Sequence, residues 1–419
     1  MNKGIKVILV GVVSLLIGGC TMDPALLKEG WSSSQHDELL DILKKDKYGS
    51  MCNLKSQYET YLRTKDAKIL NKLAFGYAQN LANSCIDLNK FRASQRSRNG
   101  RRIKTHFELN IQKANATKIM SDLRDGKDIE EILKPYIPTH PQFKKLLSQY
   151  QSLKNSSDKA KLRVVKLNIE RLKLMRNLSW NNYILINVPE YKFRMFEGGK
   201  KSMEFNVVVG KRNWQTPIFA SQMEYIVLNP AWHVPDNIAR AEYIPKLIKN
   251  PYALKKKNMV IRTDYNVGSK EVDPKSVDWK KYLTKEYKHK NLPYKIIQKS
   301  SRRNALGTVK FIFPNRFSVY MHDTQSKGLF KRKVRAYSHG CVRLAEPQKL
   351  LKHVSNNYTG SSYSSIKKGR KRTKYLNLQK NIPVQIGYFT AYVNESGSLE
   401  FFKDVYGYDS SMKLKGGAI

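Results

Sequence analysis

The spacing of apolar residues changes once along this chain. From about residue 39 to residue 174, apolar residues recur at intervals of three and four, as in Ala67–Leu88 and Ile129–Leu153, and this pattern predicts amphipathic helices. A basic amphipathic helix is expected over Lys159–Met175. After about residue 178, β-rich runs such as Tyr183–Asn187 and Phe205–Val209 predict strands. The pattern therefore predicts a helical region followed by a mostly β domain.

Three features refine this division. Prolines at positions 135, 138 and 141 break the second helical stretch and leave a separate helix over Gln142–Leu153. Strand-like runs return at residues 308–313, 317–321 and 383–393, and residues 395–397 carry a hairpin signal. The segment Pro235–Asn304 is polar, lysine-rich and partly helical, notably over Ala239–Leu247. We expect it to be an insertion into the β domain.

The first residues predict an export signal. Lys3 and Lys6 precede the uncharged, mostly apolar run Val7–Ile17, which is too short to cross a bilayer comfortably. Residues 17–20 resemble a bacterial lipobox, in which Cys20 is acylated and becomes the mature N-terminus. We expect a lipid anchor that faces the periplasm. The outer membrane is expected rather than the inner one, because Thr21 follows the cysteine at the position where, by resemblance to enteric lipoproteins, an Asp favours retention in the inner membrane. The alternative is an ordinary secretory signal, which leaves the protein soluble.

The net charge indicates which classes of binding partner the protein favours. The chain has 77 lysines and arginines against 34 acidic residues in 419 positions, a formal charge of +43. Such a charge suggests nucleic acid, but the export signal and the lack of zinc-finger, RNA-binding or helix-turn-helix patterns argue against it. Polyanionic envelope surfaces suit this charge better.

The four cysteines fall into three groups. Cys20 belongs to the lipobox and Cys341 to a motif rich in histidine and glycine. Cys52 and Cys85 lie in the helical region, and in an oxidising compartment we expect them to form a disulfide. The alternative is two buried free thiols.

Two histidines precede Cys341, His339 by two residues and His322 by nineteen. A cysteine is a useful nucleophile as the thiolate, and a nearby imidazole can take its proton. Gly340 lets the backbone approach a substrate carbonyl, so the amides of Gly340 and Cys341 are candidates for an oxyanion hole. A zinc site that adds His353 is disfavoured, because the spacing matches no common zinc motif and the metal would occupy the thiolate. We expect no metal and no cofactor.

The motif also carries a resemblance. His322 followed at a distance by Ser338-His339-Gly340-Cys341-Val342-Arg343 resembles the signature of L,D-transpeptidases with a YkuD-type catalytic domain. Residues 216–217, 229–235, 329–330, 335–336 and 404–409 resemble the large YcbB-type branch. The resemblance covers roughly residues 160–410.

This resemblance implies a role for each residue of the motif. Cys341 is the nucleophile and His322 the general base, oriented either by the Asp323 side chain or by a backbone carbonyl. His339 shapes the site, while Ser338 and Arg343 position the loop or a substrate carboxylate, with a structural ion pair as the alternative for Arg343. For Tyr320 and Trp232 core packing is the default expectation, and a contact with substrate is the alternative.

We therefore expect an α+β protein. It comprises a signal peptide (1–19), a helical region (20–177), a mostly β catalytic domain (178–410) with a capping insertion (235–304) and a tail (411–419). The resemblance implies that Cys341 forms a thioester with a peptidoglycan tetrapeptide stem and passes it to an amine, giving a 3-3 cross-link in cell-wall biogenesis. The alternatives are an L,D-carboxypeptidase that trims tetrapeptides and a non-catalytic wall-binding lipoprotein. The oligomeric state stays open.

Overall fold

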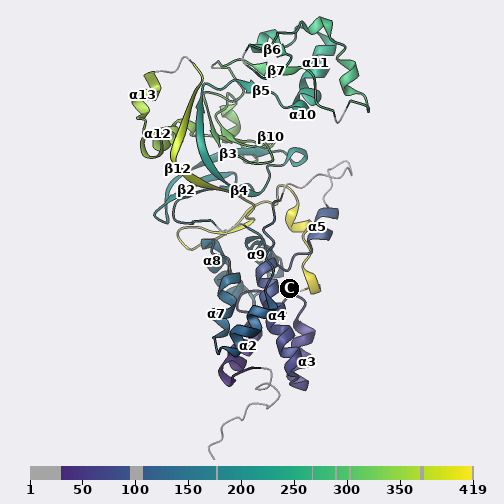
Figure 1. The fold of residues 1–419 in the computed structure, drawn as a ribbon, viewed down its shortest axis with the longest axis vertical. Coiled ribbons are helices and arrows are strands. Elements are labelled where there is room, and N and C mark those ends of the chain that lie inside the picture. The colour runs from purple at the N-terminus through teal and green to yellow at the C-terminus, as the bar shows by residue number, and fades with distance from the viewer. Residues whose placement is uncertain are drawn as a thin grey trace, which may run out of the picture.

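The computed structural model describes residues 30–94, 107–175, 178–266, 268–287, 290–301, 303–368 and 372–417. The predicted signal peptide and Cys20 lie outside these residues. The molecule is elongated, with a helical region at one end, a large sheet in the middle and a smaller lobe at the other end (Figure 1).

The helical region precedes the sheet, as the periodicity predicts. Helix α2 begins with a capping box, in which Ser32 and Gln35 exchange side-chain and backbone hydrogen bonds. Helix α8 begins at Pro141, a position where the missing amide costs nothing. The described α-helices of this region are α2 (Ser33–Lys45), α3 (Lys55–Thr64), α4 (Ala67–Asn83), α5 (Leu88–Ser94), α6 (Ala116–Arg124), α7 (Ile129–Leu133), α8 (Pro141–Leu153) and α9 (Lys159–Leu172).

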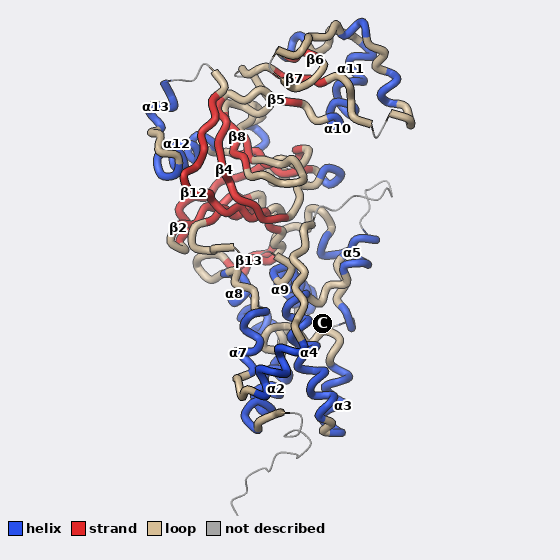
Figure 2. Tube along the Cα trace, viewed as in Figure 1, coloured by secondary structure: helices blue, strands red, loops and turns tan. Residues whose placement is uncertain are grey.

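A nine-stranded sheet forms the middle of the molecule (Figure 2). Its strands run in the order β10-β3-β11-β9-β8-β4-β12-β1-β2, and β2 also pairs with β3, so the sheet closes on itself. Closure leaves few free edges and encloses an apolar core. The strands are β1 (Tyr183–Asn187), β2 (Lys192–Glu197), β3 (Lys200–Gly210), β4 (Phe219–Leu228), β8 (Val309–Ile312), β9 (Met321–His322), β10 (Ala336–Ser338), β11 (Val342–Leu344) and β12 (Lys374–Gly387).

The strand predicted over residues 317–321 is wrong in extent, since only Met321 of that run belongs to β9. The Asn315 side chain holds the preceding residues in a loop: its amide nitrogen donates to the carbonyls of Phe313 and Val319, and its oxygen accepts from the amides of Phe317 and Val319. These bonds compete with a strand ladder.

The smaller lobe, which we call the cap, arises from the predicted insertion, but it begins slightly before the predicted boundary at Pro235, since Trp232 and His233 already belong to its sheet. It contains a three-stranded sheet of order β5-β7-β6, formed by β5 (Trp232–His233), β6 (Met259–Arg262) and β7 (Lys295–Gln298). Its helical elements include α10 (Asp236–Ile238), the π-helical turn η3 (Ala239–Tyr243) and α11 (Ile244–Lys249). The cap has its own apolar cluster, including Ile244, Leu247 and Trp279, so it is packed independently of the large sheet.

The last part of the chain returns to the helical region. The hairpin β13 (Ala391–Val393) and β14 (Leu399–Phe401) lies against α8, where the Gln142 side chain bonds both the amide and the carbonyl of Val393. Leu414 forms a β-bridge with Ile86, and Lys415 donates its amide to the Cys85 carbonyl. Arg171 of α9 makes a buried ion pair with Asp409 in α14 (Tyr408–Ser411). The described part of the predicted tail, residues 411–417, is therefore packed against the helical region.

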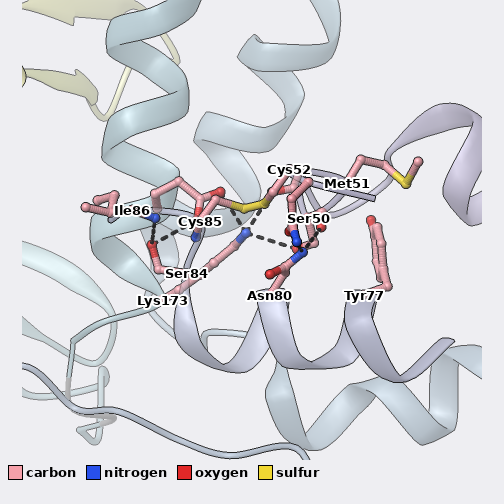
Figure 3. Close-up of a disulfide and its surroundings, with 12 residues drawn as sticks. Ser50, Met51, Cys52, Tyr77, Asn80, Ser84, Cys85, Ile86 and Lys173 are labelled. Carbon is pink, nitrogen blue, oxygen red and sulfur yellow. Dashed lines mark hydrogen bonds and ion pairs between the residues drawn. A yellow bond between two sulfur atoms is a disulfide. The ribbon is translucent and has the colours of Figure 1, made fainter. Parts of the chain in front are cut away.

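Cys52 and Cys85 are joined by a disulfide in this region (Figure 3). Their Cα atoms are 5.8 Å apart, within the range typical of disulfides. Glu170 lies beside the bridge, where it accepts from the Cys85 amide and pairs with Lys166 and Lys173. The two sulfurs and a Glu170 oxygen lie within 4.8 Å of one another, but the disulfide takes both sulfurs that a metal would need.

Removing this disulfide is expected to destabilise the protein strongly. The double variant Cys52→Ala/Cys85→Ala should lose about 3 to 4 kcal/mol in the free energy of unfolding, because the bridge closes a loop across 33 positions of the unfolded chain. Urea denaturation of the two proteins measures this loss, with Cys341→Ala as a control that leaves the bridge intact. Free alkylation of both thiols in the native, oxidised protein would contradict the prediction.

Candidate functional site

The strand register gathers the motif residues on one face of the large sheet. Strands β11, β9 and β8 are neighbours, and Arg343, His322 and Lys310 stand side by side across them. Because side chains alternate along a strand, Tyr320 and Cys341 project to the same side, two residues before His322 and Arg343. The intervening side chains of Phe311, Met321, Val342 and Leu344 project to the opposite side, into the enclosed core.

A tight turn before β11 positions Cys341. Gly340 has φ of +119°, a backbone conformation that favours glycine. The Ser338 hydroxyl accepts from the Gly340 amide at 3.1 Å and donates to the Cys341 carbonyl at 2.6 Å. The Thr216 hydroxyl donates to the Gly340 carbonyl. Ser338 therefore fixes the turn, as one of its two predicted roles requires.

The same bonds correct the predicted oxyanion hole. The Gly340 amide is occupied by Ser338 and is not available to a substrate. No hydrogen-bond partner of the Cys341 amide is found within the described part of the chain. If this turn stabilises a developing oxyanion, the Cys341 amide is the donor that remains.

Cys341 is a partly exposed free cysteine. Burial of the sulfur raises the pKa of the thiol to about 11, although the Tyr320 amide and the positive charges of Arg343 and Lys310 lower it. The thiol is therefore protonated at neutral pH in the free protein.

His322 is poised as a neutral base. Its side chain is buried, and its Nδ1 lies 2.5 Å from the carbonyl oxygen of Asp323. Burial and the nearby Arg343 lower the pKa of His322 to about 3. A neutral imidazole that donates from Nδ1 to this carbonyl keeps its lone pair on Nε2.

The backbone carbonyl of Asp323, and not its carboxylate, contacts the imidazole, so the structure favours the carbonyl among the two predicted alternatives for the orienting group. The Asp323 carboxylate accepts from the amides of Thr308 and Thr324 and pairs with Lys327 at 2.6 Å. These bonds hold the loop after β9 and so fix the position of the carbonyl. The carboxylate itself is not bonded to the imidazole.

His339 connects the turn to the cap. Its Nε2 lies 2.8 Å from Glu242 in η3, and its ring packs edge-on against Trp214 with ring centroids 4.9 Å apart. Burial lowers the pKa of His339, while Glu242 opposes this effect. The cap is therefore in direct contact with the residue next to the turn glycine.

Arg343 has no carboxylate partner within ion-pair distance among the described residues, so the alternative of a structural ion pair is not supported. Its Nε is buried without a hydrogen-bond partner. Burial lowers the pKa of Arg343. A guanidinium in this state suits an anionic ligand.

The two predicted aromatic contacts differ in their surroundings. Tyr320 lies beside His322 with ring centroids 5.7 Å apart, on the face that carries Cys341. Trp232 instead packs against Tyr243 and the apolar cluster of the cap. Core packing therefore accounts for Trp232, and its predicted substrate contact is not supported by its position.

Sequence reasoning missed three residues near the site. Lys310 stands next to His322 and its Nζ lies 5.5 Å from the centre of the Tyr320 ring. Glu242 contacts His339, and His233 at the base of the cap is close enough to Lys310 that the ammonium lowers its pKa. Lys310 carried a signal as a lone charge inside the apolar run Val309–Ile312, and His233 lay in the resembling run 229–235, but neither was assigned to the site.

Comparisons with a protein family and with a curated relative both indicate similarity to L,D-transpeptidases. The family of L,D-transpeptidase catalytic domains called YkuD matches residues 181–386. A Haemophilus influenzae protein that carries the name "Putative L,D-transpeptidase" is 31% identical over 255 residues, which cover 59% of this chain and 48% of that protein. The chain thus spans about half the length of this curated relative.

Solved structures of L,D-transpeptidases are also similar in part. One from Mycobacterium smegmatis has 9% identity and a TM-score of 0.22, covering 49% of this chain and 58% of its own. A mutant enzyme from Enterococcus faecium has 9% identity and a TM-score of 0.22, covering 76% and 82%. At these TM-scores the likeness carries no argument about the site.

Proposed function

We propose that the protein is a peptidoglycan L,D-transpeptidase with Cys341 as its nucleophile, since the family of YkuD-type L,D-transpeptidase catalytic domains matches residues 181–386. The observation that supports this proposal is the register of β11 and β9. It places His322 next to β11, the strand that begins directly after Cys341, and the Asp323 carbonyl holds the neutral imidazole in position. Membership in the larger YcbB-type branch stays a prediction.

The proposed first half-reaction forms a thioester. The Cys341 sulfur attacks the carbonyl carbon at the L-centre of the diamino acid in a donor tetrapeptide, while His322 Nε2 takes the thiol proton. The Cys341 amide donates to the developing oxyanion. When the C–N bond breaks, the proton passes from His322 to the leaving nitrogen, and D-alanine departs.

The second half-reaction transfers the acyl group. A neutral side-chain amine from another stem attacks the thioester carbon, and His322 takes the proton that the nitrogen loses. The C–S bond then breaks, and the proton returns to the sulfur. With an amine acceptor the product is a 3-3 cross-link, and with water it is a tripeptide.

Incubation of the purified protein with a disaccharide-tetrapeptide tests this function. The expected product in mass spectra is a cross-linked dimer that has lost one D-alanine. Tripeptide alone would favour the carboxypeptidase alternative. Unchanged tetrapeptide, with no acyl adduct on the protein, would favour a non-catalytic wall-binding protein.

We further propose that the cap excludes water from the thioester. It contacts the catalytic turn through Glu242 and His339, and its surface carries Lys246, Lys249 and Lys255, which attract the carboxylates of stem peptides. Exclusion of water favours the amine over hydrolysis.

Replacing residues 240–300 by a short Gly/Ser linker is therefore expected to lower the ratio of cross-linked to hydrolysed product several-fold. The cap has its own apolar cluster, so its removal should leave the large sheet folded and Cys341 reactive toward a small thiol reagent. Product ratios from the same tetrapeptide measure the effect, with Glu242→Gln as a variant that keeps the cap and loses only its charge at His339. An unchanged ratio in the truncated enzyme would show that the cap has no part in acceptor choice.

We also propose that the protein is held at the membrane by a lipid on Cys20. The basis is the sequence of residues 17–20, which lies outside the described residues. No helix in the described ranges has both the length and the apolar character that a bilayer span needs. Metabolic labelling with an alkynyl fatty acid tests the anchor: the wild type should be labelled and Cys20→Ala should not.

A further inference from the structure

We propose that Lys310 recognises the free C-terminal carboxylate of the donor stem peptide. This inference rests on the proposed function and deepens it, because it assigns a substrate-binding residue beyond the motif.

The first argument is position. Lys310 stands directly opposite His322 on the neighbouring strand β8, and Arg343 stands opposite His322 on the other side, on β11. Adjacent strands are about 4.8 Å apart, so two cationic side chains begin roughly 10 Å apart with the base between them. Both side chains are long enough to reach a group that lies over His322.

The second argument is the lack of a counter-charge. Lys310 is half-buried, and burial lowers the pKa of its ammonium. Among the described residues it makes no ion pair with a carboxylate, and the one group that opposes this lowering is the charge of Cys341. Arg343, by comparison, is also stabilised by the charge of Glu242. A desolvated cation without a partner is costly, and such residues gather where a ligand supplies the missing charge.

The third argument is what surrounds the ammonium. It lies over the Tyr320 ring, 5.5 Å from its centre, and close enough to His233 to lower the pKa of that imidazole. No hydrogen bond joins Lys310 to Cys341 in the described part of the structure. The ammonium is therefore directed toward the site without being bonded to the nucleophile.

The chemistry of the donor fits this arrangement. In a tetrapeptide stem, only the nitrogen and the α-carbon of the leaving D-alanine separate the scissile carbonyl carbon from the terminal carboxylate. When Cys341 attacks that carbonyl, the carboxylate must lie close to the groups around Cys341 and His322. An ammonium beside His322 is placed to bind it, and a peptide whose C-terminus is amidated offers no charge in return.

The experiment compares two donors that differ only at the C-terminus, a tetrapeptide ending in a free acid and the same peptide ending in a carboxamide. The ratio of their kcat/KM values is the readout. Because Lys310 also lowers the pKa of the Cys341 thiol, the Lys310→Met variant is expected to lose some activity toward both donors. The ratio removes this common loss.

The wild type is expected to prefer the acid donor by about tenfold to a hundredfold, the range for a charge-assisted hydrogen bond. Lys310→Met should lose this preference, and Lys310→Arg should keep most of it. Lys374→Met removes an exposed lysine from the same sheet and should leave the ratio unchanged.

A preference that persists in Lys310→Met, or a wild type that does not distinguish the two donors, overturns the inference. A Lys310→Met variant that does not fold is recognised by circular dichroism, and the Lys310→Arg ratio then decides the question. If the wild type releases no product from either donor, the proposed function itself fails, which is a distinct outcome.

Discussion

Cys341→Ala is expected to abolish cross-linking by the purified protein, with a loss of at least about a thousandfold in turnover. Loss of the nucleophile removes the covalent route, and in enzymes of this kind the remaining groups supply only a small part of the rate. The test is the yield of cross-linked dimer from a tetrapeptide donor.

The variant should keep its fold, because Cys341 is partly exposed and lies in a turn that is fixed by Ser338 and Thr216 rather than by the thiol. Its thermal unfolding should therefore match that of the wild type. By family resemblance a carbapenem should add once to the wild type and not to the variant. Cross-linking retained by Cys341→Ala, or an adduct mapped to Cys52 or Cys85, would exclude this cysteine as the nucleophile.

His322→Gln is expected to lower kcat/KM by about a hundredfold to ten-thousandfold, the usual contribution of a positioned general base. Glutamine is similar in size and can donate to the Asp323 carbonyl, but it cannot accept the thiol proton. Asp323→Asn is the matched comparison and should retain much more activity, because the imidazole contacts the backbone of this residue and not its carboxylate. Equal losses in the two variants would mean that the carboxylate takes part in catalysis.

The pH dependence of Cys341 alkylation follows from the pKa values of Cys341 and His322. With the pKa of Cys341 raised to about 11 and that of His322 lowered to about 3, both groups are neutral between these values in the free protein. Alkylation of Cys341 by iodoacetamide should rise about tenfold per pH unit through neutral pH toward about pH 11, because the thiolate is the reacting form. A plateau near pH 7 would instead indicate a preformed thiolate–imidazolium pair.

The sequence was enough to predict that a helical region precedes a mostly β domain, and to identify the motif around Cys341. The change from helical to strand periodicity near residue 178 matches the change from α9 to β1, and the prolines before Gln142 mark the start of α8. The run at residues 317–321 misled the prediction, because β-rich composition does not reveal that the Asn315 side chain occupies the backbone groups of the loop.

The residues around the motif were harder to find, for physical reasons. Lys310 and His322 are twelve positions apart and meet only through the pairing of β8 with β9. Glu242 contacts His339 only because η3 of the cap lies against the turn before β11. The orienting group of His322 could not be chosen from sequence, since the competing carbonyl and carboxylate both belong to Asp323.

The return of residues 391–415 to the helical region has a consequence for how the protein is made. Helices near the beginning of the chain acquire essential neighbours from its last part: Gln142 needs Val393, Arg171 needs Asp409, and the backbone at Cys85 needs Lys415. During synthesis the helices are made first, and these contacts form only after the large sheet and the residues that follow it have been made. The helical region therefore cannot complete its packing before residues 391–415 are present, although its own sequence comes first.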